Sequence, residues 1–138
     1  MGMLIDIDQG DATPLYEQLR RQIIAAVANG ELAPGDRLPS VRSLAVDLGI
    51  NLHTVNRAYA TLRDDGYIIM RRGSGAVVAE HGEAVNRTGR TEESLHRLVL
   101  AHKAGGGDMA SFLIMARRQC ELIYGRGLQG PAQGGNNE

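Results

Sequence analysis

Four polar side chains that can hydrogen-bond to the edges of bases lie within one short stretch, His53, Thr54, Asn56 and Arg57. The apolar residues interleaved with them recur at helical spacing, and they are Val55, Ala58, Tyr59 and Leu62. At about 100° per residue, a helix here would bury the apolar set and expose the polar set. An exposed helical face of this kind fits a DNA major groove. An ordinary two-helix corner of an all-α enzyme has the same local pattern, so the flanking sequence must decide.

A second helix is predicted directly before this one. Ser40 can cap its first turn, and its apolar face is Val41, Leu44, Ala45 and Leu48. Gly49 ends it, because glycine adopts the left-handed conformation that a helix end requires. Asn51 can cap the next helix, and Gly66 closes it. The stretch from residue 40 to 66 therefore predicts a helix-turn-helix.

The N-terminal flank predicts a supporting helix and an ordered connector. Thr13 followed by Pro14 is typical of a helix start, with the threonine as cap and the proline at the first helical position. The helix is expected to end near residues 29–30. Pro34 and Gly35 then indicate a turn, and Pro39 restricts the residue before the next helix. Residues 3–7 are interpreted as an edge strand or an ordered arm.

The C-terminal flank predicts a β-hairpin, because two runs of β-forming residues surround Gly73, Ser74 and Gly75. The glycines let the backbone approach another surface closely, and Arg71 and Arg72 at the tip can neutralise phosphates. A plain surface hairpin with solvated arginines is the alternative. Directly after a candidate recognition helix, a basic wing is the favoured reading, and residues 1–80 are expected to form a winged helix-turn-helix.

The composition limits the class of protein. The chain has 138 residues and a formal net charge of -1, so DNA binding would depend on a local basic surface and not on total charge. No apolar run is long enough to span a membrane, which predicts a cytoplasmic protein without a membrane partner. The single cysteine, Cys120, excludes an intrachain disulfide and is expected to be a small buried hydrophobe.

The C-terminal part is predicted to mediate dimerisation. Residues 81–90 are polar and contain glycines, which favours a linker, and helical periodicity returns over residues 91–125, with a break at residues 105–107. The second of these helices, which Asp108 can cap, carries more apolar residues than one partner helix can cover, so we expect another subunit to cover them. The candidate dimerisation residues are Leu95, Leu98, Val99, Phe112, Leu113, Met115 and Leu122. Residues 126–138 are expected to form a disordered tail.

Four segments together resemble the GntR family of bacterial transcription regulators. They read PLYEQLRRQI, NGELAPGDRLPSVRSLA, LGINLHTVNRAYATLRDDGYI and RRGSGAVV, and they cover roughly the first half of the chain. The short helical C-terminal segment looks like that of the YtrA-type subfamily, whose members are dimeric and usually repress transcription. The resemblance implies a mainly α fold with a small β-hairpin, an N-terminal winged helix-turn-helix and a C-terminal two-helix dimerisation segment. It also implies a double-stranded DNA operator as the partner.

The resemblance implies roles for individual residues. Arg42, Thr54 and Gly73 match DNA-contacting positions of the family, while Asn51, Leu52, His53 and Asn56 occupy its variable reading positions. The subfamily commonly has proline in place of Leu52, and many relatives have arginine in place of Asn56, so the resemblance implies DNA binding but does not indicate the operator sequence. The full candidate DNA-binding set is Arg42, Asn51, Leu52, His53, Thr54, Asn56, Arg57, Arg71, Arg72, Gly73 and Gly75.

Other kinds of site are not predicted. His96 and His102 lie six residues apart and face different sides of a helix, so no metal site is expected. Ser74 lies in a hairpin, without the strand-to-helix turn of a nucleophile elbow, and no enzyme activity or cofactor is predicted. A winged-helix module that binds protein instead of an operator is the alternative function. The existence of a small-molecule effector is left open.

Overall fold

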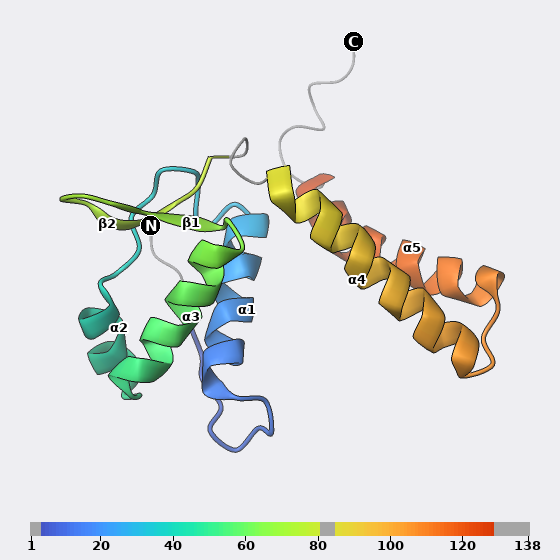
Figure 1. Cartoon of the computed structure of the whole chain (residues 1–138), viewed down its shortest axis with the longest axis horizontal. Coiled ribbons are helices and arrows are strands. Elements are labelled where there is room, and N and C mark those ends of the chain that lie inside the picture. The colour runs from blue at the N-terminus through green and yellow to red at the C-terminus, as the bar shows by residue number, and fades with distance from the viewer. Residues whose placement is uncertain (1–3, 81–84, 129–138) are drawn as a thin grey trace, which may run out of the picture. The chain divides into compact units, whose positions relative to one another are not determined.

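The computed structural model describes residues 4–80 and 85–128, and the chain divides into two compact units, Met1–Thr88 and Gly89–Glu138. Residues 4–80 form three helices and a hairpin, and Figure 1 labels every element. In chain order they are α1 (Leu15–Ala28), α2 (Val41–Leu48), α3 (Leu52–Asp64), β1 (Ile68–Arg71), β2 (Gly75–Val78), α4 (Val85–Ala104) and α5 (Met109–Leu128). This confirms the predicted fold class, mainly α with one small β-hairpin.

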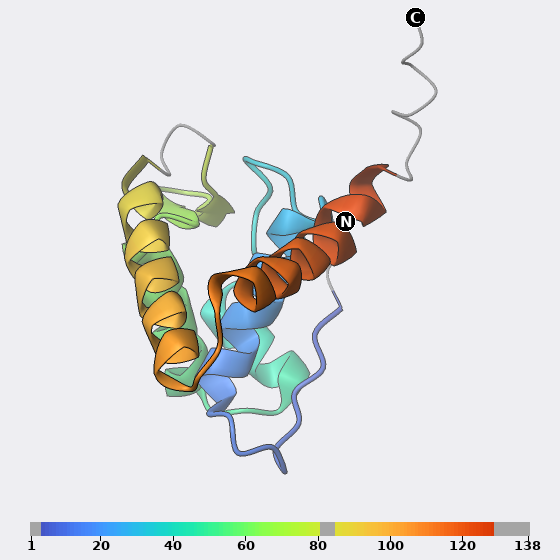
Figure 2. The ribbon, with the colours of Figure 1, turned by 90° about the vertical axis from the view of Figure 1, so that its right-hand side faces the viewer.

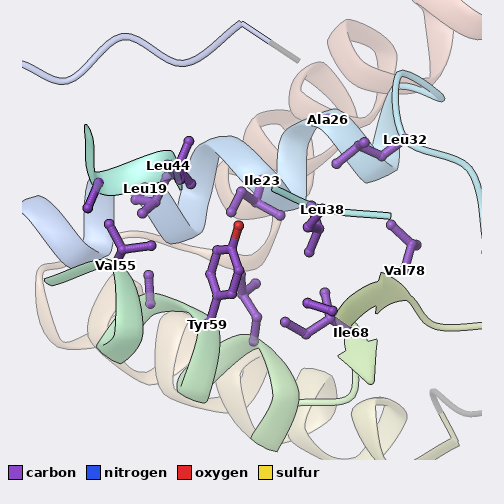
Figure 3. Packing of buried hydrophobic residues seen from close by; sticks show 14 residues of the cluster. Leu19, Ile23, Ala26, Leu32, Leu38, Leu44, Val55, Tyr59, Ile68 and Val78 are labelled. Atoms are coloured by element: carbon purple, nitrogen blue, oxygen red, sulfur yellow. The ribbon is translucent and has the colours of Figure 1, made fainter. Parts of the chain in front are cut away.

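The predicted apolar faces meet in one core. α3 lies against both α1 and α2, and β1 continues from its end (Figure 1). Figure 3 shows the side chains of these elements converging around the ring of Tyr59. All four residues of the predicted α3 stripe are buried, and Leu19, Ile23 and Leu44 join them from α1 and α2. The Tyr59 hydroxyl donates a hydrogen bond to the Pro39 carbonyl oxygen at 2.7 Å, which fastens the residue before the α2 cap to α3.

The start of α1 differs from its prediction. Leu15 is the first helical residue, and Pro14 occupies the cap position in an extended conformation without a side-chain cap. Thr13 was expected to be the cap, but its backbone N–H donates to the Asp11 carboxylate at 2.8 Å. The acidic residue two positions earlier thus forms a local turn before the helix, and the capping prediction for Thr13 is wrong.

The N-terminal segment is an ordered arm that two glutamines hold against α1. The side chain of Gln18 accepts a hydrogen bond from the Asp8 N–H and donates to the carbonyl oxygens of Asp8 and Thr13, each at 2.9 Å. Gln22 exchanges the same pair of bonds with Asp6 one turn further on. The two amide side chains therefore pair with the backbone of the arm as a neighbouring strand would. These hydrogen bonds satisfy the polar atoms of the buried Gln18.

The connector between α1 and α2 adds a third extended segment to the hairpin. Gly35 N–H donates to the Val78 carbonyl oxygen at 2.8 Å, and Val78 N–H donates to the Asp36 oxygen at 2.9 Å. Leu38 N–H then donates to Ala76 O at 2.8 Å, which places Arg37 opposite Val77. Since β1 and β2 pair antiparallel from Ile68 opposite Val78 to Arg71 opposite Gly75, β2 is held on both sides.

α4 begins before its predicted limit and α5 ends beyond its predicted limit, whereas the break between them lies where it was predicted. α4 begins at Val85, so residues 85–90, predicted as linker, are helical, and only residues 81–84 of that linker lie outside the described part. α5 extends to Leu128, and the rest of the predicted tail, residues 129–138, also lies outside the described residues. Asp108 caps α5 as predicted, accepting from Ser111 N–H at 2.8 Å. Among the described residues, no helix is both long and apolar enough to cross a membrane.

Candidate nucleic-acid interface

The N-terminal end of α3 presents the predicted reading residues to solvent. Asn51 caps the helix, because its side-chain oxygen accepts a hydrogen bond from the His53 N–H at 2.7 Å, and its amide NH₂ group is left to donate. His53 and Asn56 are exposed, Leu52 is 39% exposed, and Thr54 is half-buried. The fold therefore brings these five positions together on one accessible helix end.

Arg57 is exposed but already has a partner. Its guanidinium carbon lies 3.9 Å from the centre of the Tyr16 ring, a cation–π contact that ties α3 to α1. Arg57 is also exposed, so its guanidinium group remains accessible to solvent. Tyr16 of α1 therefore helps to position Arg57 beside the N-terminal end of α3. The sequence pattern did not identify this role of Tyr16.

α2 places Arg42 at its first turn. The Ser40 hydroxyl accepts a hydrogen bond from the Ser43 N–H at 3.0 Å, and Gly49 ends the helix with φ 67°, both as predicted. Arg42 is exposed on this turn. The start of α2 and the tip of the hairpin border one hollow of about 710 Å³, which is lined by Ser40, Ser74 and Gly75 among others.

The hairpin tip is a tight turn that two glycines make possible. Ser74 N–H donates to the Arg71 carbonyl oxygen at 3.1 Å and closes the turn. Gly73 and Gly75 have φ values of 84° and 75°, the left-handed region where a side chain is strained. Nothing lies within 4 Å of where a Cβ would stand at either position, so the turn needs glycine for its backbone conformation and not for space. Arg71 and Arg72 are exposed beside it.

One basic residue at the tip was missed by the sequence analysis. Arg37 lies on the connector, but its Nε–H donates to the Ser74 carbonyl oxygen at 3.4 Å, so its side chain belongs to the wing. The pairing that brings it there joins residues 40 positions apart, Arg37 and Val77. No local periodicity could have revealed the contact.

The apolar residues assigned to dimerisation lie on the surface of the second unit. None of the described side chains of residues 91–125 is buried, and Leu98, Leu113 and Leu122 are 61%, 56% and 53% exposed. Two hollows of about 630 and 620 Å³ lie along α4 and α5, which separate from each other away from their turn (Figure 2). They are lined between them by Leu95, Leu98, Val99, Phe112, Leu113 and Met115, whereas Leu122 lines neither. Cys120, expected to be buried, is exposed in the single chain because no described residue packs over its side of α5.

The turn between α4 and α5 is built around His102. Its Nε2 is 2.8 Å from the Ser111 hydroxyl oxygen, and its ring meets Phe112 edge-on at 5.4 Å between centroids. Hydrogen bonds from the N–H and hydroxyl of Ser111 lower the pKa of Asp108. The ring fills the space beside Gly107, where any side chain would overlap it. Within the described residues, no group of three or more His, Cys, Asp or Glu side chains is close enough to hold a metal ion.

Comparisons with known proteins agree with this geometry. Residues 15–78 match the family model described as bacterial regulatory proteins, gntR family. The HTH-type transcriptional repressor YtrA of Bacillus subtilis is 38% identical over 106 residues, which span 74% of this chain and 82% of that protein. The solved structure of YtrA from Sulfolobus acidocaldarius, a GntR-family transcription factor, is 37% identical and has a TM-score of 0.60, over 74% of this chain and 98% of that one. A transcriptional antiterminator from Listeria monocytogenes is 25% identical with a TM-score of 0.73, over 87% and 92% of the two chains.

Proposed function

Because this chain belongs to the GntR family of DNA-binding transcriptional regulators, we propose that it is a homodimeric repressor that binds a pseudo-palindromic operator. The observation that carries the proposal is the exposed polar end of α3 on the same compact unit as an arginine-bearing hairpin. A helix enters the major groove with its N-terminal residues, while a basic hairpin contacts the flanking backbone. Such a regulator acts on chromosomal DNA, so we place it in the cytoplasm.

We assign the residues two kinds of role. Asn51, His53 and Asn56 carry donors and acceptors that can discriminate base pairs, so they read the sequence. Leu52 and Thr54 supply apolar contact and a hydroxyl group on the same helix end. The arginines, which are Arg42, Arg57, Arg71 and Arg72, bind phosphates, and Gly73 and Gly75 allow the wing backbone to approach the duplex.

Dimerisation is supported by the apolar surface of the second unit. Leucine and valine side chains of α4 are exposed, as are leucine, isoleucine and methionine side chains of α5, and water contact with such a surface is unfavourable. A second copy of the same two helices would bury it. A two-fold dimer presents two copies of α3 to two mirrored half-sites, which is why the operator should be an inverted repeat.

Selection of bound fragments from the source genome with purified protein tests the proposal. We expect an enriched inverted repeat whose affinity falls steeply as salt is raised, because bound phosphates release counterions. Fragments without a shared repeat would contradict operator recognition. They would favour the alternative, a winged helix that binds protein, although Leu52 is the only sizeable apolar residue among the reading positions.

The name of the Bacillus relative supports repression as the direction of regulation, and this part of the proposal has its own test. A reporter driven by the selected operator should lose expression when the chain is produced and regain part of it with Asn56→Ala, because this substitution of an exposed residue is expected to weaken recognition of the site. Increased expression in place of decreased expression would make the chain an activator.

A further inference from the structure

Arg37 lies on the connector segment that pairs with β2. Directly opposed residues of antiparallel segments project their side chains from the same face, and Arg37, Val77 and Ile69 are successive partners across the three segments. The neighbouring positions Ile68 and Val78 face the main core cluster, whereas Val77 is buried but lies outside that cluster. The Arg37 side chain is exposed, and with Ser74 and Gly75 it lines the hollow between the hairpin tip and α2.

The wing turn contacts the Arg37 guanidinium group. Its Nε–H donates to Ser74 O at 3.4 Å, a long hydrogen bond that orients the side chain more than it stabilises the fold. Arg71 stands on the other side of the same turn, opposite Gly75. The turn is thus flanked by an arginine on each side, with Arg72 following Arg71.

Acidic side chains of residues 4–80 do not pair with the arginines of this tip. Among residues 4–80, no carboxylate forms an ion pair with Arg37, Arg71 or Arg72, while Arg20, Arg21 and Arg63 all have acidic partners. In a chain of net charge -1, three unpaired arginines around one turn concentrate positive charge at one place. Such a place attracts an anion.

We propose that Arg37 is a third wing arginine that binds a backbone phosphate of the operator duplex. With Nε engaged on Ser74 O, the two terminal nitrogens remain free to donate, and their planar arrangement matches a phosphate group. The carbonyl contact favours this orientation before DNA arrives, which reduces the side-chain entropy lost on binding. The inference rests on the proposed DNA binding and adds a contact that comes from outside the hairpin.

Arg37→Gln removes the charge and is expected to lower the slope of log affinity against log salt by about 0.9. Relative to equal binding of the two proteins at about 1 M salt, this slope corresponds to a loss of affinity of about fivefold at about 0.15 M salt and about fifteenfold at about 0.05 M. Arg37→Lys keeps a charge that reaches a phosphate, so it should retain the slope. Arg21→Gln is the matched control, because it removes the same charge away from the reading residues. Arg21 is next to Arg20, and Arg20 contacts Asp65, just beyond the C-terminal end of α3.

Binding of the full-length variants to the selected operator and to an unrelated duplex is measured by fluorescence anisotropy at four salt concentrations, after circular dichroism has checked their folding. A reduced slope for Arg37→Gln on both duplexes, retained in Arg37→Lys and Arg21→Gln, supports the proposal. An unchanged slope, or an equal loss in the glutamine and lysine variants without a slope change, overturns it. Binding of the wild type to neither duplex would instead overturn DNA binding itself. If Arg37→Gln does not fold, Arg37→Met, which keeps the aliphatic stem, replaces it.

Discussion

Replacing Tyr59 by phenylalanine removes one hydroxyl group from the core and leaves the ring that Figure 3 shows at its centre. The residue is 4% exposed, and its hydroxyl donates to Pro39 O at 2.7 Å. A net hydrogen bond contributes about 0.5–1.5 kcal/mol. Because Pro39 is exposed, water can partly replace the lost donor, and we expect a loss of about 1 kcal/mol at pH 7. For a unit of this size, that lowers Tm by about 4–8 °C.

The difference in free energy of unfolding between the wild type and Tyr59→Phe is expected to change sign at alkaline pH. Burial raises the pKa of the Tyr59 phenol well above its ordinary value of 10.0. The unfolded chain therefore releases this proton at lower pH than the folded chain, and the wild type loses up to about 1.4 kcal/mol per pH unit above pH 10. Phenylalanine has no proton to release. The stability advantage of the wild type should accordingly shrink above pH 10 and reverse near about pH 11.

Urea unfolding of the wild type and Tyr59→Phe, followed by circular dichroism between pH 7 and 11, checks both parts. The other tyrosines are common to the two proteins and cancel in the difference. Tyr124→Phe, at a residue that is 71% exposed, should match the wild type throughout. A difference between the wild type and Tyr59→Phe that stays constant up to pH 11 would refute the argument from burial.

Three further outcomes are expected. Asn56→Ala should change base preference by about 1–3 kcal/mol at particular operator positions. Arg42→Ala should instead weaken binding to every sequence and lower the slope of log affinity against log salt by about one unit. Gel shifts on an operator library separate the two effects, and equal losses on all sequences for both variants would contradict the assigned roles. A chain ending at residue 88 should sediment as a monomer and bind the whole operator about 10²–10⁴-fold more weakly, and a truncated dimer of full affinity would move dimerisation into the first unit. Gly107→Ala should displace the His102 ring, because the new methyl group would overlap it. Losing about 1 kcal/mol of dimerisation free energy would weaken the dimer about fivefold, which sedimentation measures. An unchanged dimer would show that the turn does not support dimerisation.

The sequence predicted those parts of the fold that depend on local spacing. The buried stripe of α3, the Ser40 and Asn51 caps and the glycine end of α2 follow from residues three or four positions apart, and the structure confirms them. Glycine at position 89 and the polar residues around it indicated a linker, yet α4 runs through them. A helix can continue through a glycine at a cost of about 1 kcal/mol when its neighbours favour it, and composition alone does not reveal that balance.

Contacts between distant segments could not be predicted in this way. Gln18 was unremarkable in the α1 pattern because its partners are backbone atoms of the arm, at Asp8 and Thr13. Arg57 was recognised as a polar residue of α3, but its contact with Tyr16 required the packing of α1 against α3. The roles of the reading residues stay predictions, since they depend on the DNA sequence that they meet.

The connector between α1 and α2 has a consequence for the cost of recognition. It is hydrogen-bonded to β2 along Gly35–Leu38, it is fastened to α3 by Tyr59, and it ends in the cap of α2. The wing and both helices of the helix-turn-helix therefore share one covalent and hydrogen-bonded frame, and none of them has to find its place relative to the others when the duplex arrives. Ordering a free hairpin costs about 1–2 kcal/mol of backbone entropy for every residue that is fixed, and here that cost is met during folding. Encounter with DNA can then proceed by rigid docking, with an association rate set by diffusion and charge.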